Sequence, residues 1–273
     1  MKDELKDKDQ NAKQKTWWKT LFSVFLMLVW VFCSIVASQY IVGYIMLWMI
    51  GAENFIQPVP TAIYSALAYV LAMLLIIFAP KLLAKKWGLA GKLKAKSTGK
   101  EARDSERIAL GLNGWPTWTD VGLAPAGFVV YLMLAAGLAG LFSLFPWFDA
   151  EQVQEVGFSV YVTGFDRVVA FIVLVIIAPV AEEIIFRGWL YDKLRGKFLE
   201  NYSDAISIVV SNLLVSVLFG IVHMQWNVGV NVFAMSVVLC ALREITGTIY
   251  AGILLHMLKN GIAFYLLYVL GIT

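Results

Sequence analysis

The stretch FDRVVAFIVLVIIAPVAEEIIFRGWL, residues 165–190, decides the class of fold that this sequence forms. At a rise of about 1.5 Å per residue, a helix of this length crosses the roughly 30 Å hydrocarbon core of a bilayer. The stretch nevertheless carries Glu182, Glu183 and Arg187 among apolar neighbours. Ionisable residues inside a membrane helix are costly to insert, so they mark a functional site by default.

The composition of the whole chain agrees with a membrane protein. Of its 273 residues, 60% are hydrophobic and 15% are charged, whereas soluble domains average about 45–50% apolar and about 25% charged residues. Its 22 Lys and Arg outnumber its 19 Asp and Glu by only three, which disfavours a nucleic-acid partner. We therefore expect the lipid bilayer to surround most of the chain.

Apolar stretches long enough to cross a membrane recur along the chain. We count seven, at residues 17–49, 61–83, 121–145, 165–190, 206–224, 228–242 and 248–270. The last could divide near Gly261, which would give eight. The sequence thus predicts an all-α, polytopic integral membrane bundle of seven or eight transmembrane helices. It divides into a polar N-terminal tail (1–16), accessory helices (17–145) with a basic loop (84–119), and a C-terminal core (165–270).

Lysine and arginine predict the orientation, because short basic loops stay in the cytosol. Residues 1–20 hold six lysines, residues 81–119 hold nine Lys or Arg, and three more lie at residues 193–197. The N-terminus and these two further segments are therefore expected in the cytosol. The intervening loops, at residues 51–60 and around residues 149–155, carry acidic residues and suit the outside.

Helical spacing assigns different surroundings to the two adjacent glutamates. Residues four apart share a helix face, so Glu183 and Arg187 are expected to pair. Glu182 points about 100° away, toward a polar cavity or a substrate, where a carboxylate can take a proton from water and return it to a leaving group. Pro179 has no N–H, so it should free a backbone carbonyl near Val175.

Both histidines of the chain follow in later spans, in Phe219-Gly-Ile-Val-His223 and His256-Met-Leu-Lys-Asn260. The Phe219 ring lies one turn from His223 and is expected to pack on the imidazole. Counted from the expected cytosolic helix ends at about 1.5 Å per residue, Glu182, His223, His256 and Asn260 all lie about 14–22 Å deep. We therefore expect these four side chains to meet near the middle of the membrane.

These motifs resemble those of the CAAX protease and bacteriocin-processing family, intramembrane endopeptidases that include the CAAX prenyl endopeptidases (Ras-converting enzymes). EExxxR at residues 182–187, FxxxH at 219–223 and HxxxN at 256–260 occur in the family's order. The resemblance covers about residues 165–265 and implies that residues 165–270 form the catalytic core. Many bacterial members are known as self-immunity proteins, so the plasma membrane of a prokaryote is the expected location.

The resemblance also implies a role for each site residue. Glu182 and His223 would activate a water for attack on a peptide bond, and His256 and Asn260 would stabilise the oxyanion. Glu183 would be accessory, held in place by Arg187. The implied substrate is a membrane-embedded or lipidated peptide or protein, including the prenylated CAAX type.

Two routes to water activation remain open. Direct activation by the two side chains needs no cofactor, and we favour it because the sequence lacks an HExxH helix. The alternative is a catalytic zinc ion on Glu182, His223 and His256.

Two other functions compete with proteolysis. The first is a non-catalytic membrane protein, a bacteriocin-immunity or regulatory binding partner in which the polar cluster only orients the helices. The second is an ion-coupled or proton-coupled transporter, because buried acids and histidines also line such paths. The absence of inverted repeats in the sequence weakens the transporter hypothesis.

Overall fold

The computed structural model describes residues 2–86, 109–149 and 164–271. In the first of these ranges, side chains are described for residues 17–83. Across these ranges the secondary structure is helical. The elements are α1 (Lys2–Ile50), α2 (Ala52–Phe55), α3 (Pro58–Met73), η1 (Leu74–Phe78), α4 (Ala79–Lys86), α6 (Trp118–Phe142), α7 (Gly164–Phe171), η3 (Ile172–Ile177), α8 (Ala178–Glu183), η4 (Ile184–Leu190), α9 (Tyr191–Leu199), α10 (Asp204–Ile221), α11 (Trp226–Thr246), α12 (Tyr250–Phe264) and η5 (Tyr265–Leu270). The segments η1, η3, η4 and η5 are π-helical.

Seven helices in the described ranges are long and apolar enough to cross a membrane. They span Trp17–Ile50, Pro58–Leu83, Trp118–Phe142, Gly164–Leu199, Asp204–Ile221, Trp226–Thr246 and Tyr250–Leu270. The prediction of an all-α polytopic bundle is thus confirmed, with seven spans. The alternative division near Gly261 is not seen, because α12 continues through this residue to Phe264 and on into η5. Most of the basic loop predicted at residues 84–119 lies outside the described residues, as does most of the acidic loop near residue 150.

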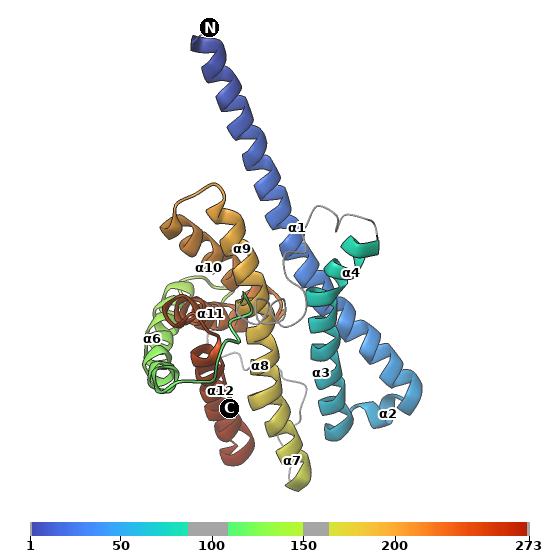
Figure 1. Ribbon diagram of the computed structural model, residues 1–273. Helices are drawn as coiled ribbons and strands as arrows, with labels where there is room; N and C mark the ends of the chain where they lie inside the picture. Colours follow the sequence, from blue (N-terminus) through green and yellow to red (C-terminus); the bar gives the residue numbers. More distant parts are fainter. Residues whose placement is uncertain (1, 87–108, 150–163, 272–273) are drawn as a thin grey trace.

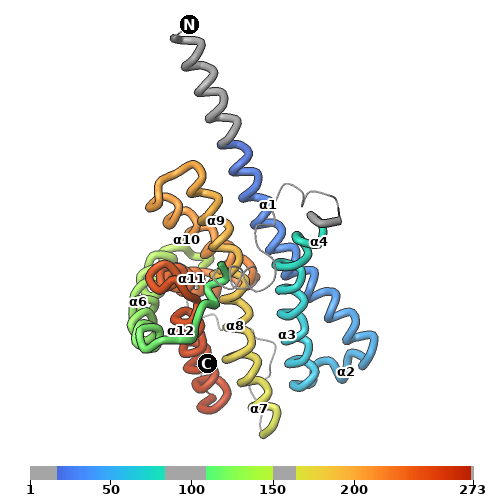
Figure 2. The backbone as a smooth tube through the Cα atoms, viewed as in Figure 1, coloured from blue at the N-terminus to red at the C-terminus, as the bar shows by residue number. Residues whose placement is uncertain are grey.

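One of the seven spans is central: it runs from α7 through η3, α8 and η4 to α9 and lies between two groups formed by the other six (Figure 1). On one side, α1 packs on α3, and α3 packs on α7 and α8. On the other side, α6 packs on α11 and α12, and α10 packs on α11. The backbone trace in Figure 2 shows the same arrangement, with the central helix between these two groups.

Two glycines bring α10 and α11 close together. A Cβ atom built on Gly220 would lie only 2.9 Å from the Gly229 carbonyl oxygen, and one on Gly229 would lie 3.1 Å from that of Gly220. Small residues at a crossing let membrane helices approach closely, where van der Waals packing replaces the hydrophobic effect as the driving force. This crossing fixes the end of α10, which precedes His223.

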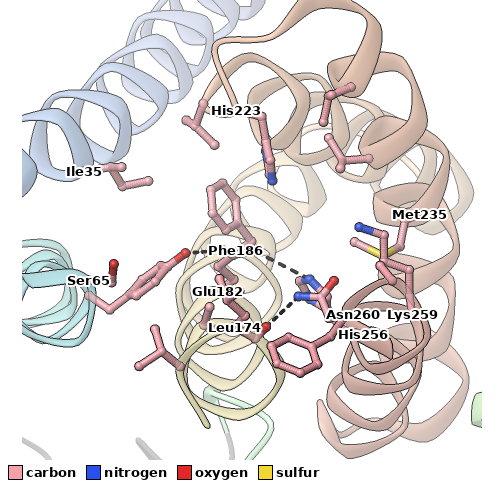
Figure 3. A pocket seen from close by; sticks show the side chains of 18 of the residues that line it. Ile35, Ser65, Leu174, Glu182, Phe186, His223, Met235, His256, Lys259 and Asn260 are labelled. Atoms are coloured by element: carbon pink, nitrogen blue, oxygen red, sulfur yellow. Dashed lines mark hydrogen bonds and ion pairs between the residues drawn. The ribbon is translucent and has the colours of Figure 1, made fainter. Parts of the chain in front are cut away.

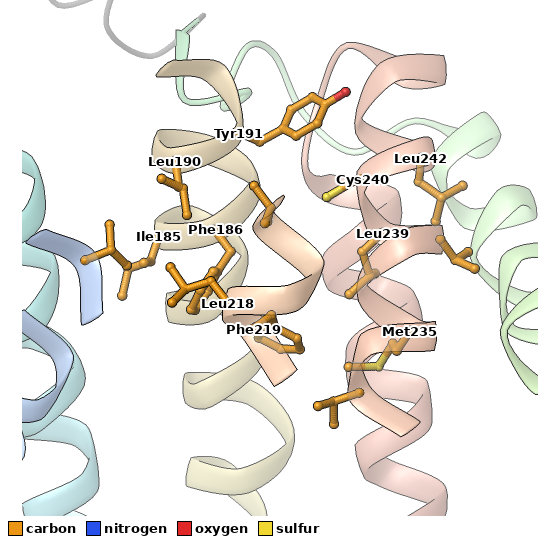
Figure 4. Close-up of a cluster of buried hydrophobic side chains, with 14 of the residues drawn as sticks. Ile185, Phe186, Leu190, Tyr191, Leu218, Phe219, Met235, Leu239, Cys240 and Leu242 are labelled. Atoms are coloured by element: carbon orange, nitrogen blue, oxygen red, sulfur yellow. The ribbon is translucent and has the colours of Figure 1, made fainter. Parts of the chain in front are cut away.

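Apolar side chains fill the space between the central helix, α10 and α11 (Figure 4). Ile185 and Phe186 of η4 are buried, as are Phe219 of α10 and Leu239 of α11. The rings of Phe186 and Phe219 meet edge to face, with centroids 4.9 Å apart. This packing holds the central helix against the two helices that follow it, and the polar site lies beside the same cluster.

Candidate active site

Proline 179 and the π-helix before it create the polar contact that ties α12 to the central helix. In η3 the backbone bonds reach five residues back, so the N–H of Ala178 donates to the carbonyl of Val173. Pro179 has no N–H for the next carbonyl, that of Leu174. The Asn260 side-chain Nδ2 donates to this oxygen instead, at 2.8 Å. A freed carbonyl was expected near Val175, and the π register explains why the one that Asn260 caps is one residue earlier.

Glu183 of α8, Arg187 of η4 and His256 of α12 form a network of contacts that is buried from solvent. The Glu183 Oε1 atom accepts from Arg187 Nη1 at 3.0 Å and lies 3.0 Å from His256 Nδ1. The three residues are 0%, 0% and 3% exposed, and the Arg187 guanidinium also lies 4.5 Å from the centre of the Phe219 ring. The predicted pairing of Glu183 with Arg187 is confirmed, and the carboxylate also fixes His256. Because a carboxylate only accepts, Nδ1 of His256 carries a proton.

Glu182 faces the other way, as the helical spacing predicted. Its Oε1 atom accepts a hydrogen bond from the Tyr69 hydroxyl at 2.5 Å, and its Oε2 atom lies 3.8 Å from His256 Nε2. The Glu182 side chain is 14% exposed, whereas that of Glu183 is fully buried. Glu182 thus lies between the Tyr69 hydroxyl and His256, and Figure 3 shows Glu182 beside His256.

His223 lies in the turn after α10, not inside a helix. Its Nδ1 atom is 2.7 Å from the Phe219 carbonyl oxygen, and the two rings pack at 4.9 Å between centroids. A carbonyl only accepts, so Nδ1 carries the proton and Nε2 has the free lone pair. Burial lowers the pKa of His223, so the imidazole is neutral at neutral pH. It points into the same space as Glu182 (Figure 3).

A cavity of about 630 Å³ collects these side chains. It is lined by α1 and α3 on one side and by α11 and α12 on the other, with the central helix between them. Of the six residues predicted for the site, four line this cavity: Glu182, His223, His256 and Asn260. The two others, Glu183 and Arg187, do not line the cavity, and Glu183 contacts it through His256. The structure thus divides the six residues into four that line the cavity and a pair, Glu183 and Arg187, that supports His256 from behind it.

Tyr69 and Lys259 are among the polar residues of the cavity that the sequence reasoning missed. Tyr69 donates to Glu182 from α3, which belongs to the accessory part of the chain, and its type and spacing in the sequence give no signal of that contact. Lys259 lines the cavity from α12 between two predicted site residues. Its charge within a membrane span was a signal that could have been used.

The zinc alternative has no support in the grouping of its three expected ligands. Among the described residues, no three His, Cys, Asp or Glu side chains are grouped closely enough to hold a metal ion. The Nδ1 atoms of both histidines are engaged, by the Glu183 carboxylate and by the Phe219 carbonyl, so only the Nε2 atom of each ring could bind a metal. Of the carboxylate oxygens of Glu182, one is bound by Tyr69. We therefore derive no catalytic step through a metal.

A protein-family comparison gives a match for the C-terminal part of the chain. Residues 164–262 match the family described as type II CAAX prenyl endopeptidase Rce1-like. This range contains all six predicted site residues and Lys259, but not Tyr69. The resemblance noted in the sequence is thereby confirmed for this part of the chain. No curated protein and no solved structure gives a significant match.

Proposed function

From the match of residues 164–262 to an Rce1-like peptidase domain, we propose that this protein is an intramembrane endopeptidase. It hydrolyses a peptide bond in a membrane-embedded or lipidated substrate, including the prenylated CAAX type. One observation carries this proposal. Glu182, with one oxygen held by Tyr69, shares a cavity with the unprotonated Nε2 atom of His223. A base beside a cavity that can hold both the water and the peptide bond is what general-base hydrolysis requires.

Glu182 and His223 act on the attacking water. The water gives its proton to this pair as its oxygen attacks the scissile carbonyl, and the proton then passes to the leaving nitrogen. The carbon–nitrogen bond breaks, and the products are a carboxylic acid and an amine. Tyr69 keeps the Glu182 carboxylate in one orientation, which reduces the entropy lost on reaching the transition state.

His256 and Asn260 stabilise the negative charge that develops on the carbonyl oxygen. His256 donates from Nε2, which needs an imidazolium, and the buried Glu183 carboxylate on Nδ1 supports that charge, much as an aspartate does in a Ser-His-Asp triad. Asn260 has a second amide hydrogen besides the one given to Leu174. Donors fixed in advance are effective because no reorganisation is needed during the reaction.

We further propose that the site lies in the plasma membrane of a prokaryote with the N-terminus in the cytosol. The support for the orientation is the distribution of basic residues in the sequence, since loops rich in Lys and Arg stay on the cytosolic side. A substrate anchored by a lipid would then enter from the bilayer and present its peptide between the helices.

Cleavage without a metal is the direct test of this function. The purified protein, reconstituted in liposomes, is expected to cleave a quenched fluorescent peptide that carries a farnesylated cysteine near its C-terminus. The rate should change by less than about twofold in the presence of a zinc chelator, because Glu182 and His223 activate the water themselves. Loss of activity with the chelator and its return with added zinc would contradict direct activation.

Tyr69→Phe is expected to lower kcat by about tenfold and to leave KM within about twofold. The change deletes only the hydroxyl that orients Glu182, and a hydrogen bond to a charged group contributes about 1.5–3 kcal/mol. The measurement is steady-state cleavage of the same peptide. Tyr44→Phe is the matched control, because Tyr44 is a largely exposed residue on α1. Equal kcat for wild type and Tyr69→Phe would remove Tyr69 from the mechanism.

A further inference from the structure

Asn231 of α11 has one end of its side-chain amide held by the protein, while the other end faces open space. The Tyr131 hydroxyl of α6 donates to the Asn231 Oδ1 atom at 2.8 Å, and Tyr131 is only 4% exposed. In the described ranges, no protein group accepts a hydrogen bond from the Asn231 Nδ2 atom. Asn231 is exposed, and both residues line the cavity of the candidate active site.

Asn212 of α10 shows the arrangement expected of an amide that only holds helices together. Its Nδ2 atom donates to the Val237 carbonyl of α11 at 3.1 Å, and its Oδ1 atom accepts from the Ser216 hydroxyl at 3.1 Å. Both ends of that amide are therefore used by the protein. At Asn231 the protein uses only the oxygen, so the Asn231 side chain offers the cavity two N–H donors.

A substrate peptide would need such donors. A peptide that lies extended in the cavity has no internal partners for its backbone carbonyls. A carbonyl left without a partner inside a membrane is costly, so the protein has to supply donors near the cleaved bond. In the proposed mechanism, those of His256 and Asn260 serve the oxyanion, and those of Asn231 are not used. The neutral amide of Asn231 suits a neutral carbonyl oxygen, which every residue of a peptide carries.

Asn231 is also placed close to the reacting atoms. It lies one helical turn before Met235, and both side chains line the cavity from the same face of α11. The helix α11 packs on α12, which carries His256 and Asn260. All four residues border a single cavity of about 630 Å³. Since an extended peptide advances at most about 3.3–3.6 Å per residue, the carbonyl that meets Asn231 belongs to a residue within a few positions of the cleaved bond.

We propose that Asn231 binds a backbone carbonyl of the substrate and that Tyr131 is the positioning residue that fixes its amide. This inference rests on the proposed function and deepens it, because it adds a subsite for the peptide backbone beside the cleaved bond. A contact with the backbone does not depend on the side chain of the substrate residue, so this subsite accepts different sequences. A donor fixed in advance by Tyr131 loses little conformational freedom when the peptide binds.

The test removes the carbonyl and the donor separately. In a set of farnesylated reporter peptides, one backbone amide at a time, other than the cleaved one, is replaced by an (E)-alkene, which keeps the shape but lacks the carbonyl oxygen. With the unaltered peptide, Asn231→Leu in liposomes is expected to lower kcat/KM about 5- to 10-fold, as fits one neutral hydrogen bond. At one position, the alkene should lower kcat/KM of wild type by a similar factor and that of Asn231→Leu no further, because the contact is already lost.

Tyr131→Phe is the second variant, because it keeps Asn231 and releases only its amide. It should lower kcat/KM about threefold for the unaltered peptide, less than loss of the whole hydrogen bond, and have no effect with the same alkene peptide. Asn113→Leu is the control and should match wild type with every peptide, since Asn113 is exposed in the loop before α6 and does not line the cavity. If Asn231→Leu and Tyr131→Phe each lower cleavage of all peptides by one constant factor, the two residues serve packing alone and the inference is overturned.

Binding measurements separate this inference from the proposed function. The same peptides are titrated by fluorescence against Glu182→Gln protein, with and without Asn231→Leu, which needs no turnover. If wild type cleaves no peptide, but Asn231 strengthens binding about fivefold and one alkene abolishes that gain, the inference holds and proteolysis is contradicted for this peptide. If no alkene position depends on Asn231 in either measurement, the inference is overturned whether or not wild type cleaves.

Discussion

Glu182→Gln is expected to lower kcat for peptide cleavage by about 10²- to 10⁴-fold, the range typical of a general base. The amide is nearly the size of the carboxylate and its oxygen still accepts from the Tyr69 hydroxyl. It cannot take a proton from water, however, so chemistry should be lost while the helices remain packed. The measurement is single-turnover cleavage of the farnesylated reporter in liposomes, with thermal unfolding measured on the same preparation.

Glu200→Gln is the matched control for this change. Glu200 is exposed in the turn after α9 and pairs with Lys197, so the same substitution there should leave kcat within about twofold of wild type. A Glu182→Gln protein that keeps more than a tenth of wild-type kcat would show that another group accepts the proton.

Arg187→Met is expected to destabilise the fold by about 3–5 kcal/mol. The Arg187 side chain pairs with Glu183, and both are completely buried, so its removal leaves a carboxylate without its cationic partner in an apolar interior. Breaking a buried pair on one side costs about this much. The measurement is thermal unfolding in detergent micelles, compared at equal expression.

The double variant Glu183→Gln with Arg187→Met separates stability from function. With both charges gone, most of the stability should return, because replacing both partners of a buried pair is often close to neutral. Cleavage should stay at least about tenfold below wild type, since the neutral amide that replaces the Glu183 carboxylate would no longer support an imidazolium at His256. A double variant with both stability and activity restored would assign Glu183 and Arg187 to folding alone.

The fold followed from the sequence because the bilayer imposes it. A helix satisfies its own backbone hydrogen bonds in lipid, so each long apolar stretch predicted a span. The residues at which the spans end were less predictable than the spans themselves. The helix predicted to end at Leu190 continues to Leu199, because the polar residues of α9 are still good helix formers in the aqueous region. The fifth span ends at Ile221, three residues before its predicted end, because the chain must reverse before Trp226 and Met224 adopts a positive φ of 55°.

The pairing within one helix was predictable, and so was the meeting of Glu182, His223, His256 and Asn260, whereas the contacts that hold these side chains in place were not. The pairing of Glu183 with Arg187 follows from spacing on one helix, and it is present. The contact of Tyr69 with Glu182 joins residues 113 positions apart. It depends on how α3 packs on α8, which no periodicity in either segment encodes. Asn260 was predicted as an oxyanion donor, and its bond to Leu174 arises only because the π register and Pro179 together free that carbonyl.

The most direct test of Glu182-dependent proteolysis compares peptide termini in cell membranes. Membrane fractions are taken from cells with the wild-type protein, with Glu182→Gln at matched expression, and without the protein, and new N- and C-termini are identified by mass spectrometry. We expect cleaved termini that occur only with wild type, and the residues beside them would identify the substrate. Identical termini in all three fractions, together with rescue of the deletion phenotype by Glu182→Gln, would contradict an enzyme and favour a binding protein.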